Sequence, residues 1–273
     1  MATRTKVPAE LYFVGSAVFH YLGPAFAVLL FARIDVLGVA WLRIASAAVI
    51  FAVWRRPSTF DRTILAWGAV LAVMNCCFYE SIDRLPLGTV AAIEFLPVIA
   101  LAAFGARTPR NAMALASAVG GVYLLTDVRL TGEPLGFAFA FANALLFALY
   151  IVLAHRVAQQ RGIEGLGAAM LVAAVVVTPI AGAQAVPAFL DPVAVLAGIG
   201  VGVSSSVIPY VCDQLAMARL PRATYALMVS LLPATATVIG ILVLRQVPSW
   251  TEVTGVALVV AGVAVQRDPA TTD

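Results

Sequence analysis

Residues 74–97 read MNCCFYESIDRLPLGTVAAIEFLP and carry the pattern on which the fold depends. The stretch ends one long apolar run, turns at Asp83, Arg84 and Pro86, and opens a second apolar run at Leu87. A helix needs about 20 apolar residues to cross the roughly 30 Å hydrocarbon core of a bilayer. Because the corner is so short, the two helices that meet there must be antiparallel neighbours. The pattern predicts a helical membrane protein.

Long apolar runs and short polar corners alternate along all 273 residues. Hydrophobic residues make up 62% of the chain and charged residues 11%, and the mean hydropathy is +0.99. A soluble domain carries about a quarter charged residues, so the composition excludes a soluble protein. The formal net charge of +3 does not indicate a nucleic-acid partner, because in a membrane protein the position of the basic residues is the informative quantity.

Ten transmembrane spans are predicted from the apolar runs and from the charges, prolines and glycines that interrupt them. Their approximate ranges are 11–31, 36–54, 63–82, 87–106, 110–126, 134–154, 165–184, 193–216, 223–244 and 250–266. The first is interpreted as a retained span, because no clear cleavage site of a signal peptide follows it. The expected fold class is an all-α membrane protein.

Basic residues predict the orientation of these spans. With a cytoplasmic N-terminus, twelve of the seventeen Lys and Arg residues lie at cytoplasmic corners, four at outer corners, and Arg43 within a span. Acidic residues show no such bias, as the positive-inside rule expects. We therefore expect a multi-pass protein of the inner (plasma) membrane with both termini in the cytoplasm, residues 267–273 forming a short cytoplasmic tail.

Five spans on each side of the midpoint predict two halves of opposite topology, residues 1–126 and 134–266. An odd number of spans per half is the arrangement of inverted-repeat transporters. The motif RLPL at 84–87 opens the fourth span, and RLPR at 219–222 opens the ninth. The sequence therefore indicates two inverted five-helix repeats.

Each of these motifs is followed by a proline inside the span, Pro97 in the fourth and Pro233 in the ninth. A proline leaves a helix carbonyl unpaired, which a membrane tolerates only beside protein, water or ligand. Interruptions at matching places in two halves point to a central binding site. The alternative is that both prolines are structural kinks.

Two opposite charges lie inside the predicted spans. Arg43 and Glu94 are each seven residues from the outer end of their span, which puts both about 10 Å deep. A direct pair is geometrically possible and would relieve two desolvation costs, although Arg43 is also long enough to reach the interface. Four further polar residues complete a predicted substrate or coupling site, a cavity open toward one face: His20, Asn75, Tyr79 and Glu80.

The eighth span is the predicted place for a bend or gate. Pro209, Tyr210 and Asp213 follow a run of three serines at 204–206. Asp213, near the cytoplasmic end, is a candidate gate residue or proton acceptor. The serines alone are weak evidence, because a serine hydroxyl can bond to its own helix backbone.

Motifs for several other chemistries are absent from the sequence. It has no GxxxxGKS loop for ATP, no HExxH and no GxSxG in a strand-turn-helix setting. Two histidines do not suggest a metal site, and Cys76, Cys77 and Cys212 are interpreted as small apolar residues. We expect no enzyme, no cofactor and no metal, so that energy for any transport would come from a gradient.

Three stretches carry a resemblance to a known group: GVAWLRIASA at 38–47, residues 74–97, and VIPYVCDQLAMARLPRATYALMVSLLPA at 207–234. They resemble the EamA-type drug/metabolite transporters, most closely the threonine/homoserine exporter subgroup. The resemblance implies ten helices in two inverted repeats and efflux of amino acids or related metabolites driven by the proton gradient. It draws attention to these motif residues: Arg43, Asn75, Tyr79, Glu94, Pro97, Pro209, Tyr210 and Pro233.

The chain departs from the family pattern in its second half. The glutamate usual before the proline is Leu232 here, and the glutamate usual at the end of the ninth helix is replaced by Arg245-Gln246. The stretch from Glu94 to Pro97 is one residue shorter than the common form. Glu94 therefore becomes the leading candidate for a proton-coupling site.

The favoured function is export of threonine- or homoserine-like amino acids, or related small metabolites. A broad drug or toxic-compound efflux carrier is the first alternative, although Arg43, Glu94 and neighbouring amides fit a zwitterion better. A non-transport membrane protein, such as a lipid-modifying enzyme, is the second. The expected partners are a small-molecule substrate, protons and membrane lipid, and no nucleic acid.

Overall fold

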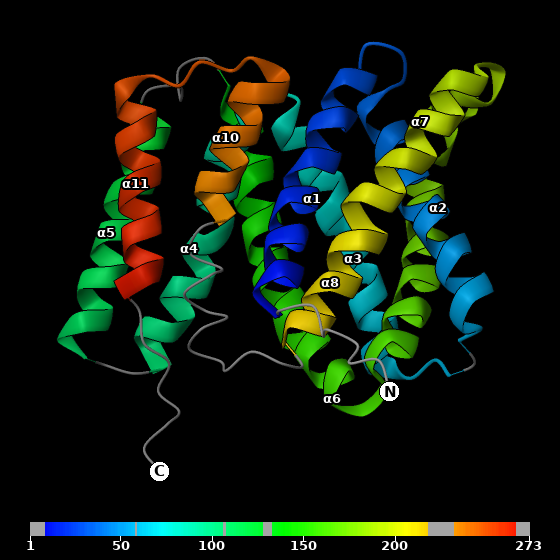
Figure 1. Cartoon of the computed structure of the whole chain (residues 1–273), viewed down its shortest axis with the longest axis horizontal. Helices are drawn as coiled ribbons and strands as arrows, with labels where there is room; N and C mark the ends of the chain where they lie inside the picture. The colour runs from blue at the N-terminus through cyan, green and yellow to red at the C-terminus, as the bar shows by residue number, and fades with distance from the viewer. Residues whose placement is uncertain (1–8, 58, 106–107, 128–132, 218–231, 266–273) are drawn as a thin grey trace, which may run out of the picture.

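A computed structural model describes residues 9–57, 59–105, 108–127, 133–217 and 232–265. All regular structure in these ranges is helical, and they contain no strand (Figure 1). The first five helices are α1 (Ala9–Leu30), α2 (Val36–Arg55), α3 (Arg62–Ile82), α4 (Leu87–Gly105) and α5 (Pro109–Asp127). Their ends lie within two residues of the predicted spans.

Side-chain caps explain where two of these helices begin. The Asp35 carboxylate accepts from the backbone N–H of Leu37 at the start of α2. Asp61 accepts from the N–H groups of Thr63 and Ile64 at the start of α3, both at 2.9 Å. Such caps satisfy amide groups that the first turn of a helix leaves unpaired.

The corner between the predicted sixth and seventh spans is present, but it is a tight kink. The element α6 (Pro134–Ala185) consists of two helices that meet at Gly162, which departs from helical geometry with φ 52 and ψ −130. The predicted loop of residues 155–164 is therefore mostly helical. It consists largely of good helix formers such as Ala, Arg and Gln, and the glycine takes the positive φ at which the chain reverses.

The remaining elements follow in order. A 3-10 turn, η1 (Val186–Leu190), leads to α7 (Pro192–Gly202), a π-helical turn, η2 (Val203–Val207), and α8 (Ile208–Met217). The last two described helices are α10 (Leu232–Leu244) and α11 (Trp250–Val265). The RLPR motif at 219–222 and the first part of the predicted ninth span lie outside the described residues.

Within the described ranges, six helices are long and apolar enough to cross a membrane. They cover Leu11–Leu30, Val36–Arg55, Arg62–Ile82, Pro134–Ala154, Arg161–Leu190 and Pro192–Asp213. Three shorter apolar helices cover Leu87–Pro97, Leu232–Leu244 and Trp250–Gly262. Large side chains such as Val53, Val175 and Leu242 remain about three-quarters exposed, as a surface facing lipid would be.

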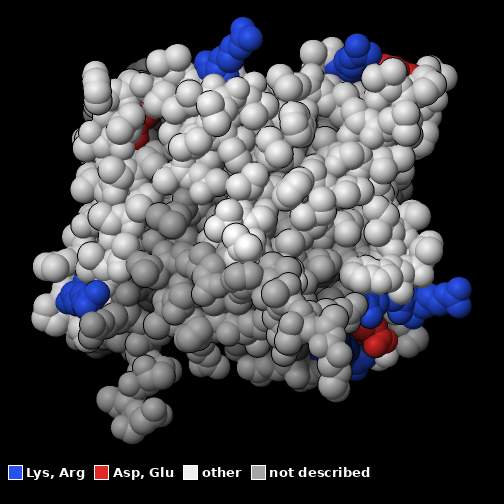
Figure 2. Space-filling model, viewed as in Figure 1, with Lys and Arg blue, Asp and Glu red and all other residues white. Residues whose placement is uncertain are grey.

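The helices run between two opposite faces of the molecule. The described chain begins and ends at the same face, the lower one in Figure 1. Charged side chains gather near the upper and lower edges in Figure 2, with a broad, almost uncharged band between them. At the upper face, Arg33 bonds to Asp191 at 3.2 Å and so joins the α1–α2 corner to the start of α7. The backbone N–H groups of Ala194 and Val193, and this arginine, hold the pKa of Asp191 below its ordinary value.

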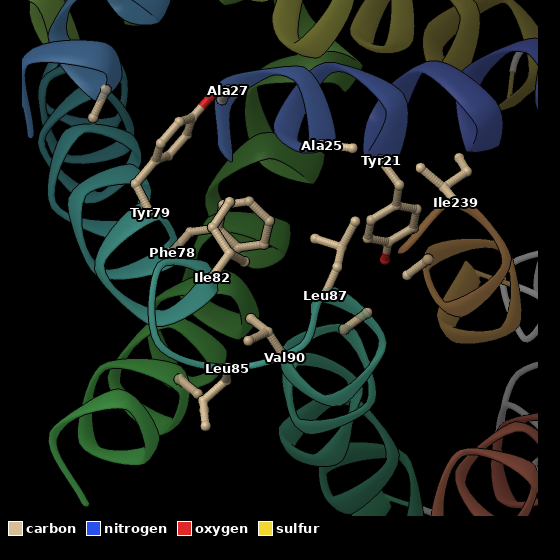
Figure 3. Close-up of a cluster of buried hydrophobic side chains, with 14 of the residues drawn as sticks. Tyr21, Ala25, Ala27, Phe78, Tyr79, Ile82, Leu85, Leu87, Val90 and Ile239 are labelled. Atoms are coloured by element: carbon tan, nitrogen blue, oxygen red, sulfur yellow. The ribbon is translucent and has the colours of Figure 1, made fainter. Parts of the chain in front are cut away.

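Two large apolar clusters hold the bundle together. One joins α2, α3 and α8 to α6 through residues such as Phe51, Trp67 and Leu166. The other joins α1, α4, α10 and neighbouring helices, and Figure 3 shows Tyr21 of α1 and Leu87 of α4 meeting within it. α5 packs chiefly against α11 at the left edge of Figure 1. This packing positions the buried polar groups described next.

Candidate functional site

Among the described residues, three charged side chains are buried. Arg43 of α2 and Glu94 of α4 are each only 5% exposed, and Glu252 is 4% exposed at the start of α11, where it accepts from the backbone N–H of Ser249. An ionised group at such a place is costly unless it is paired or bonded to polar groups. The hydrogen-bond partners of Arg43 and of Glu94 define the candidate site.

Arg43 is bonded to the π-helical turn. Its Nε donates to Ser206 Oγ at 2.9 Å, and an Nη donates to the backbone carbonyl of Ser205 at 3.0 Å. Its guanidinium also lies 5.5 Å from the centre of the Tyr79 ring, within the range of a cation–π contact. Arg43 therefore does not extend to the interface, the alternative that its length had left open.

Pro209 explains why a carbonyl is available to Arg43. Proline has no backbone N–H, so it cannot bond to the carbonyl four residues earlier. That residue is Ser205. The π-helical turn just before the proline also changes the backbone hydrogen bonds, which there join residues five positions apart. A π-helical turn therefore lies just before Pro209, and the guanidinium of Arg43 bonds to the Ser205 carbonyl, which the proline cannot pair.

Two glycines let the backbones approach this turn. A Cβ on Gly202 would overlap Ser46 and the carbonyl oxygen of Arg43, and a Cβ on Gly23 would overlap the hydroxyl and amide of Ser205. α1 and α2 can therefore both pack directly on the π-helical turn. Ser16 of α1 adds a hydrogen bond to the Pro209 carbonyl at 3.2 Å.

Glu94 is bonded to a different helix. Asn143 of α6 donates through Nδ2 to Glu94 Oε1 at 3.1 Å, and the Asn143 side chain is fully buried. Glu94 and Arg43 are close enough to interact electrostatically. They do not form the direct ion pair that equal depth had made possible, because each is bonded to a neutral polar group instead.

Several buried polar atoms near these charges make no well-aligned hydrogen bond. They are Tyr79 Oη and Ser205 Oγ, which lie beside Arg43 and near each other, and Asn143 Oδ1, which belongs to the amide bonded to Glu94. Tyr21 Oη, within electrostatic range of Glu94, is a further one. Buried polar groups are nearly always satisfied, so each exception calls for an explanation.

His20 and Tyr210 meet beside this group. Their ring centres are 6.4 Å apart, and Tyr210 lies 6.3 Å from Tyr150 of α6. The ring of Tyr150 stacks on Phe147, which in turn contacts Phe95, the neighbour of Glu94. A series of aromatic rings therefore runs from α1 through α8 and α6 to α4.

Other predicted site residues lie elsewhere or have local partners. Asn75 is buried, but its Nδ2 donates to the Leu71 carbonyl of its own helix. Glu80 bonds to Arg84 at 2.6 Å near the end of α3, apart from Arg43 and Glu94. Asp213 is half-buried on α8, one turn after Tyr210. Pro97 and Pro233 lie within α4 and at the start of α10.

Asn143 and Ser205 are the residues that the sequence reasoning missed. Asn143 stands alone as an amide in an otherwise apolar span, residues 134–154, and a polar side chain at that depth is itself a signal of function. Ser205 was visible only as one of three serines, which helices also use locally. Ser204 does so, since its hydroxyl donates to the Gly200 carbonyl at 2.8 Å.

Known proteins resemble this arrangement of helices and its sequence. Residues 134–266 match the EamA-like transporter family. The chain is 31% identical to the threonine/homoserine exporter RhtA of Escherichia coli strain K12, over 82% of this chain and 79% of that protein. The chain belongs to the EamA-like transporter family.

Further similarities cover still more of this EamA-like transporter. It is 29% identical to the threonine/homoserine exporter RhtA of Salmonella typhimurium strain LT2, over 90% of this chain and 88% of that protein. A solved crystal structure that is 18% identical has a TM-score of 0.65 and covers 94% of this chain and 96% of its own, a likeness of fold alone. The chain is thus a multi-pass membrane transporter and not an enzyme.

The cavity of this EamA-like transporter lies away from Arg43 and Glu94. It holds about 250 Å³ between the α3–α4 and α10–α11 corners, and its polar lining includes Arg84, Thr237 and Glu252. None of the six predicted substrate or coupling residues lines it. The cavity predicted around Arg43 and Glu94 would be a different place and stays a prediction.

Gln246 joins two corners at this cavity. Its Oε1 accepts from the backbone N–H of Leu87 at the start of α4, at 3.2 Å. An uncharged amide can fill this role because the first turn of a helix has unpaired N–H groups. Among the described residues, no group of three His, Cys, Asp or Glu side chains could hold a metal ion.

An amide restored at position 209 should make Arg43 less necessary for stability. In Pro209→Ala, residue 209 has an N–H one turn after the Ser205 carbonyl. We expect Arg43→Ala to lower the midpoint temperature of unfolding in detergent less in that background than in the wild type. The loss from an unsatisfied buried carbonyl is about 1–3 kcal/mol, which a double-mutant cycle resolves.

Pro179→Ala in α6 is the matched control for this cycle. The residue four positions before Pro179, Val175, is 74% exposed, and Arg43 does not bond to its carbonyl. Pro179→Ala and Arg43→Ala should therefore be additive. Additive effects of Pro209→Ala and Arg43→Ala would contradict the assignment of the carbonyl bond.

Proposed function

We propose that this transporter exports threonine- or homoserine-like amino acids, or related small metabolites, across the inner membrane. One observation carries the proposal: Arg43 and Glu94 are both buried in the bundle and are bonded to neutral polar groups rather than to each other. An α-amino acid carries one charge of each sign, so it can complement both residues at once. The relatives named as threonine/homoserine exporters support this substrate class.

The proposal includes ten spans in two inverted five-helix repeats, residues 1–126 and 134–266. Its support is the pattern of packing. α5 packs with α11 and α4 with α10, and the contact of α1 with α10 has a counterpart in that of α6 with α4. A pseudo-two-fold relation of two halves would produce such pairs. The family match over 134–266 covers the second half alone.

We further propose that both termini are cytoplasmic, with residues 267–273 as a tail. The face at which α1 begins has six of the described arginines: Arg55, Arg56, Arg62, Arg110, Arg156 and Arg161. The opposite face has Arg33, Arg84 and Arg245. This imbalance favours the first face as the cytoplasmic one.

Glu94 is the proposed site of proton coupling. Leu232 and Gln246 occupy the places of the family's usual second-half carboxylates, which leaves Glu94 as the buried carboxylate beside Arg43. A carboxylate that binds either a proton or the ammonium group of the substrate exchanges one for the other. Proton entry would then be linked to amino-acid export.

Broad efflux of drugs or toxic compounds is the second candidate. The series of aromatic rings from His20 to Phe95 favours it, because flat apolar compounds stack on such rings. Arg43 argues against cationic compounds, which are the usual substrates of acidic, aromatic sites. The first candidate accounts for both buried charges.

Export should depend on both buried charges. In cells loaded with threonine or homoserine, we expect Arg43→Ala and Glu94→Gln each to lower the rate of export about tenfold or more, since each loses a charge-assisted hydrogen bond worth about 1.5–3 kcal/mol. Arg33→Ala and Glu164→Gln remove exposed charges of the same types and should leave the rate unchanged. Full export by both buried-charge variants, at equal amounts in the membrane, would refute the site.

Proton coupling should be lost with the Glu94 carboxylate. In liposomes, a pH gradient should accelerate wild-type homoserine transport. The exchange that remains in Glu94→Gln at saturating homoserine should not respond to the gradient. A gradient response of equal size in Glu94→Gln would place the proton site elsewhere, and a wild type without any response would show uncoupled transport.

A further inference from the structure

We infer that Arg43 and Glu94 lie at opposite ends of one zwitterion site, and that three neutral side chains beside them determine which end of the substrate each one binds. Tyr79 and Ser205, with Arg43, hold the substrate carboxylate. Asn143, with Glu94, holds the ammonium group. This inference rests on the proposed function and deepens it by naming the residues that recognise each end.

The Arg43 end consists of hydrogen-bond donors. Arginine has five N–H groups, of which the structure uses Nε and one Nη, for Ser206 and for the Ser205 carbonyl. The hydroxyls of Tyr79 and Ser205 lie beside this guanidinium and near each other, both side chains are fully buried, and neither oxygen makes a well-aligned hydrogen bond. Two such hydroxyls and a cation form a match for a carboxylate, which only accepts.

The Glu94 end consists of hydrogen-bond acceptors. Because an ionised carboxylate only accepts, the amide group that bonds to Glu94 Oε1 must be the NH₂ of Asn143. That assignment leaves Asn143 Oδ1 as an acceptor, and it is buried without a partner. A carboxylate and an amide oxygen form a match for an ammonium group, which only donates.

The two ends lie on different elements. The donors come from α2, α3 and the π-helical turn, whereas the acceptors come from α4 and α6. Arg43 and Glu94 are within electrostatic range but unpaired with each other. A bound zwitterion would therefore join the two sets of helices, and a molecule that has only one of the two charges would contact only one set.

Analogues that lack one charged group test this assignment. Purified protein in liposomes exchanges labelled homoserine in the presence of 3-amino-1-propanol, which lacks the carboxylate, or 4-hydroxybutanoate, which lacks the ammonium group. Ser205→Ala and Tyr79→Phe should weaken homoserine binding about tenfold and weaken inhibition by 4-hydroxybutanoate, but not by 3-amino-1-propanol. Asn143→Leu should have the opposite selectivity, and Asn143→Ser provides a milder second variant.

Ser204→Ala is the matched control, because the Ser204 hydroxyl lies in the same turn but bonds to the Gly200 carbonyl. It should leave both inhibition constants unchanged. Equal losses for both analogues in every variant, or no loss in any, would overturn the inference. So would a wild type that exchanges homoserine but is inhibited by neither analogue. A wild type that exchanges neither threonine nor homoserine would overturn the proposed function as well.

Discussion

The carbonyl that Pro209 leaves unpaired, and the Arg43 guanidinium that bonds to it, set the geometry of the interior. In a membrane a free carbonyl must find a donor within the protein, and a buried cation must find acceptors. One hydrogen bond meets both requirements here: an Nη of Arg43 donates to the Ser205 carbonyl at 3.0 Å. The bond ties α2 to the π-helical turn, and Gly23 and Gly202 allow the backbones to come close enough. Arg43 is thereby held in the bundle instead of at its surface.

Because Arg43 bonds to the Ser205 carbonyl, it does not form an ion pair with Glu94. A tight Arg43–Glu94 ion pair would neutralise both charges and leave little to attract a charged substrate. Bonds to neutral partners, Ser206 for one and Asn143 for the other, retain the charges while reducing the cost of burying them. Arg43 and Glu94 are therefore not partners in a structural ion pair.

Periodicity and composition were sufficient for the helices but not for their contacts. Long apolar runs located α1 to α5 within two residues, because each had to match the thickness of a bilayer. The reversal between the predicted sixth and seventh spans is present, but the charges that indicated it did not predict that residues 155–164 are mostly helical. Only Gly162 breaks that helix.

The charged residues of the candidate site could be predicted from the sequence, but their hydrogen-bond partners could not. Arg43 and Glu94 were evident because an ionised residue in an apolar run is rare. Their partners depend on how each helix is rotated and on which neighbour it faces, and one sequence does not encode that in a local pattern. Glu80 appeared equally suitable, yet Arg84 one turn later pairs with it. Ser205 lies four residues before Pro209, so its carbonyl lacks the usual helix amide donor. That relation predicts a role for Ser205 only when Arg43 is known to be the donor.

The most direct test of the central claim is an experimental structure of the protein with homoserine bound. The account predicts the substrate carboxylate within hydrogen-bond distance of the Arg43 guanidinium and the ammonium group at Glu94, with the bond from Arg43 to the Ser205 carbonyl retained. Homoserine bound instead in the cavity lined by Arg84 and Glu252, with Arg43 and Glu94 unchanged, would contradict it.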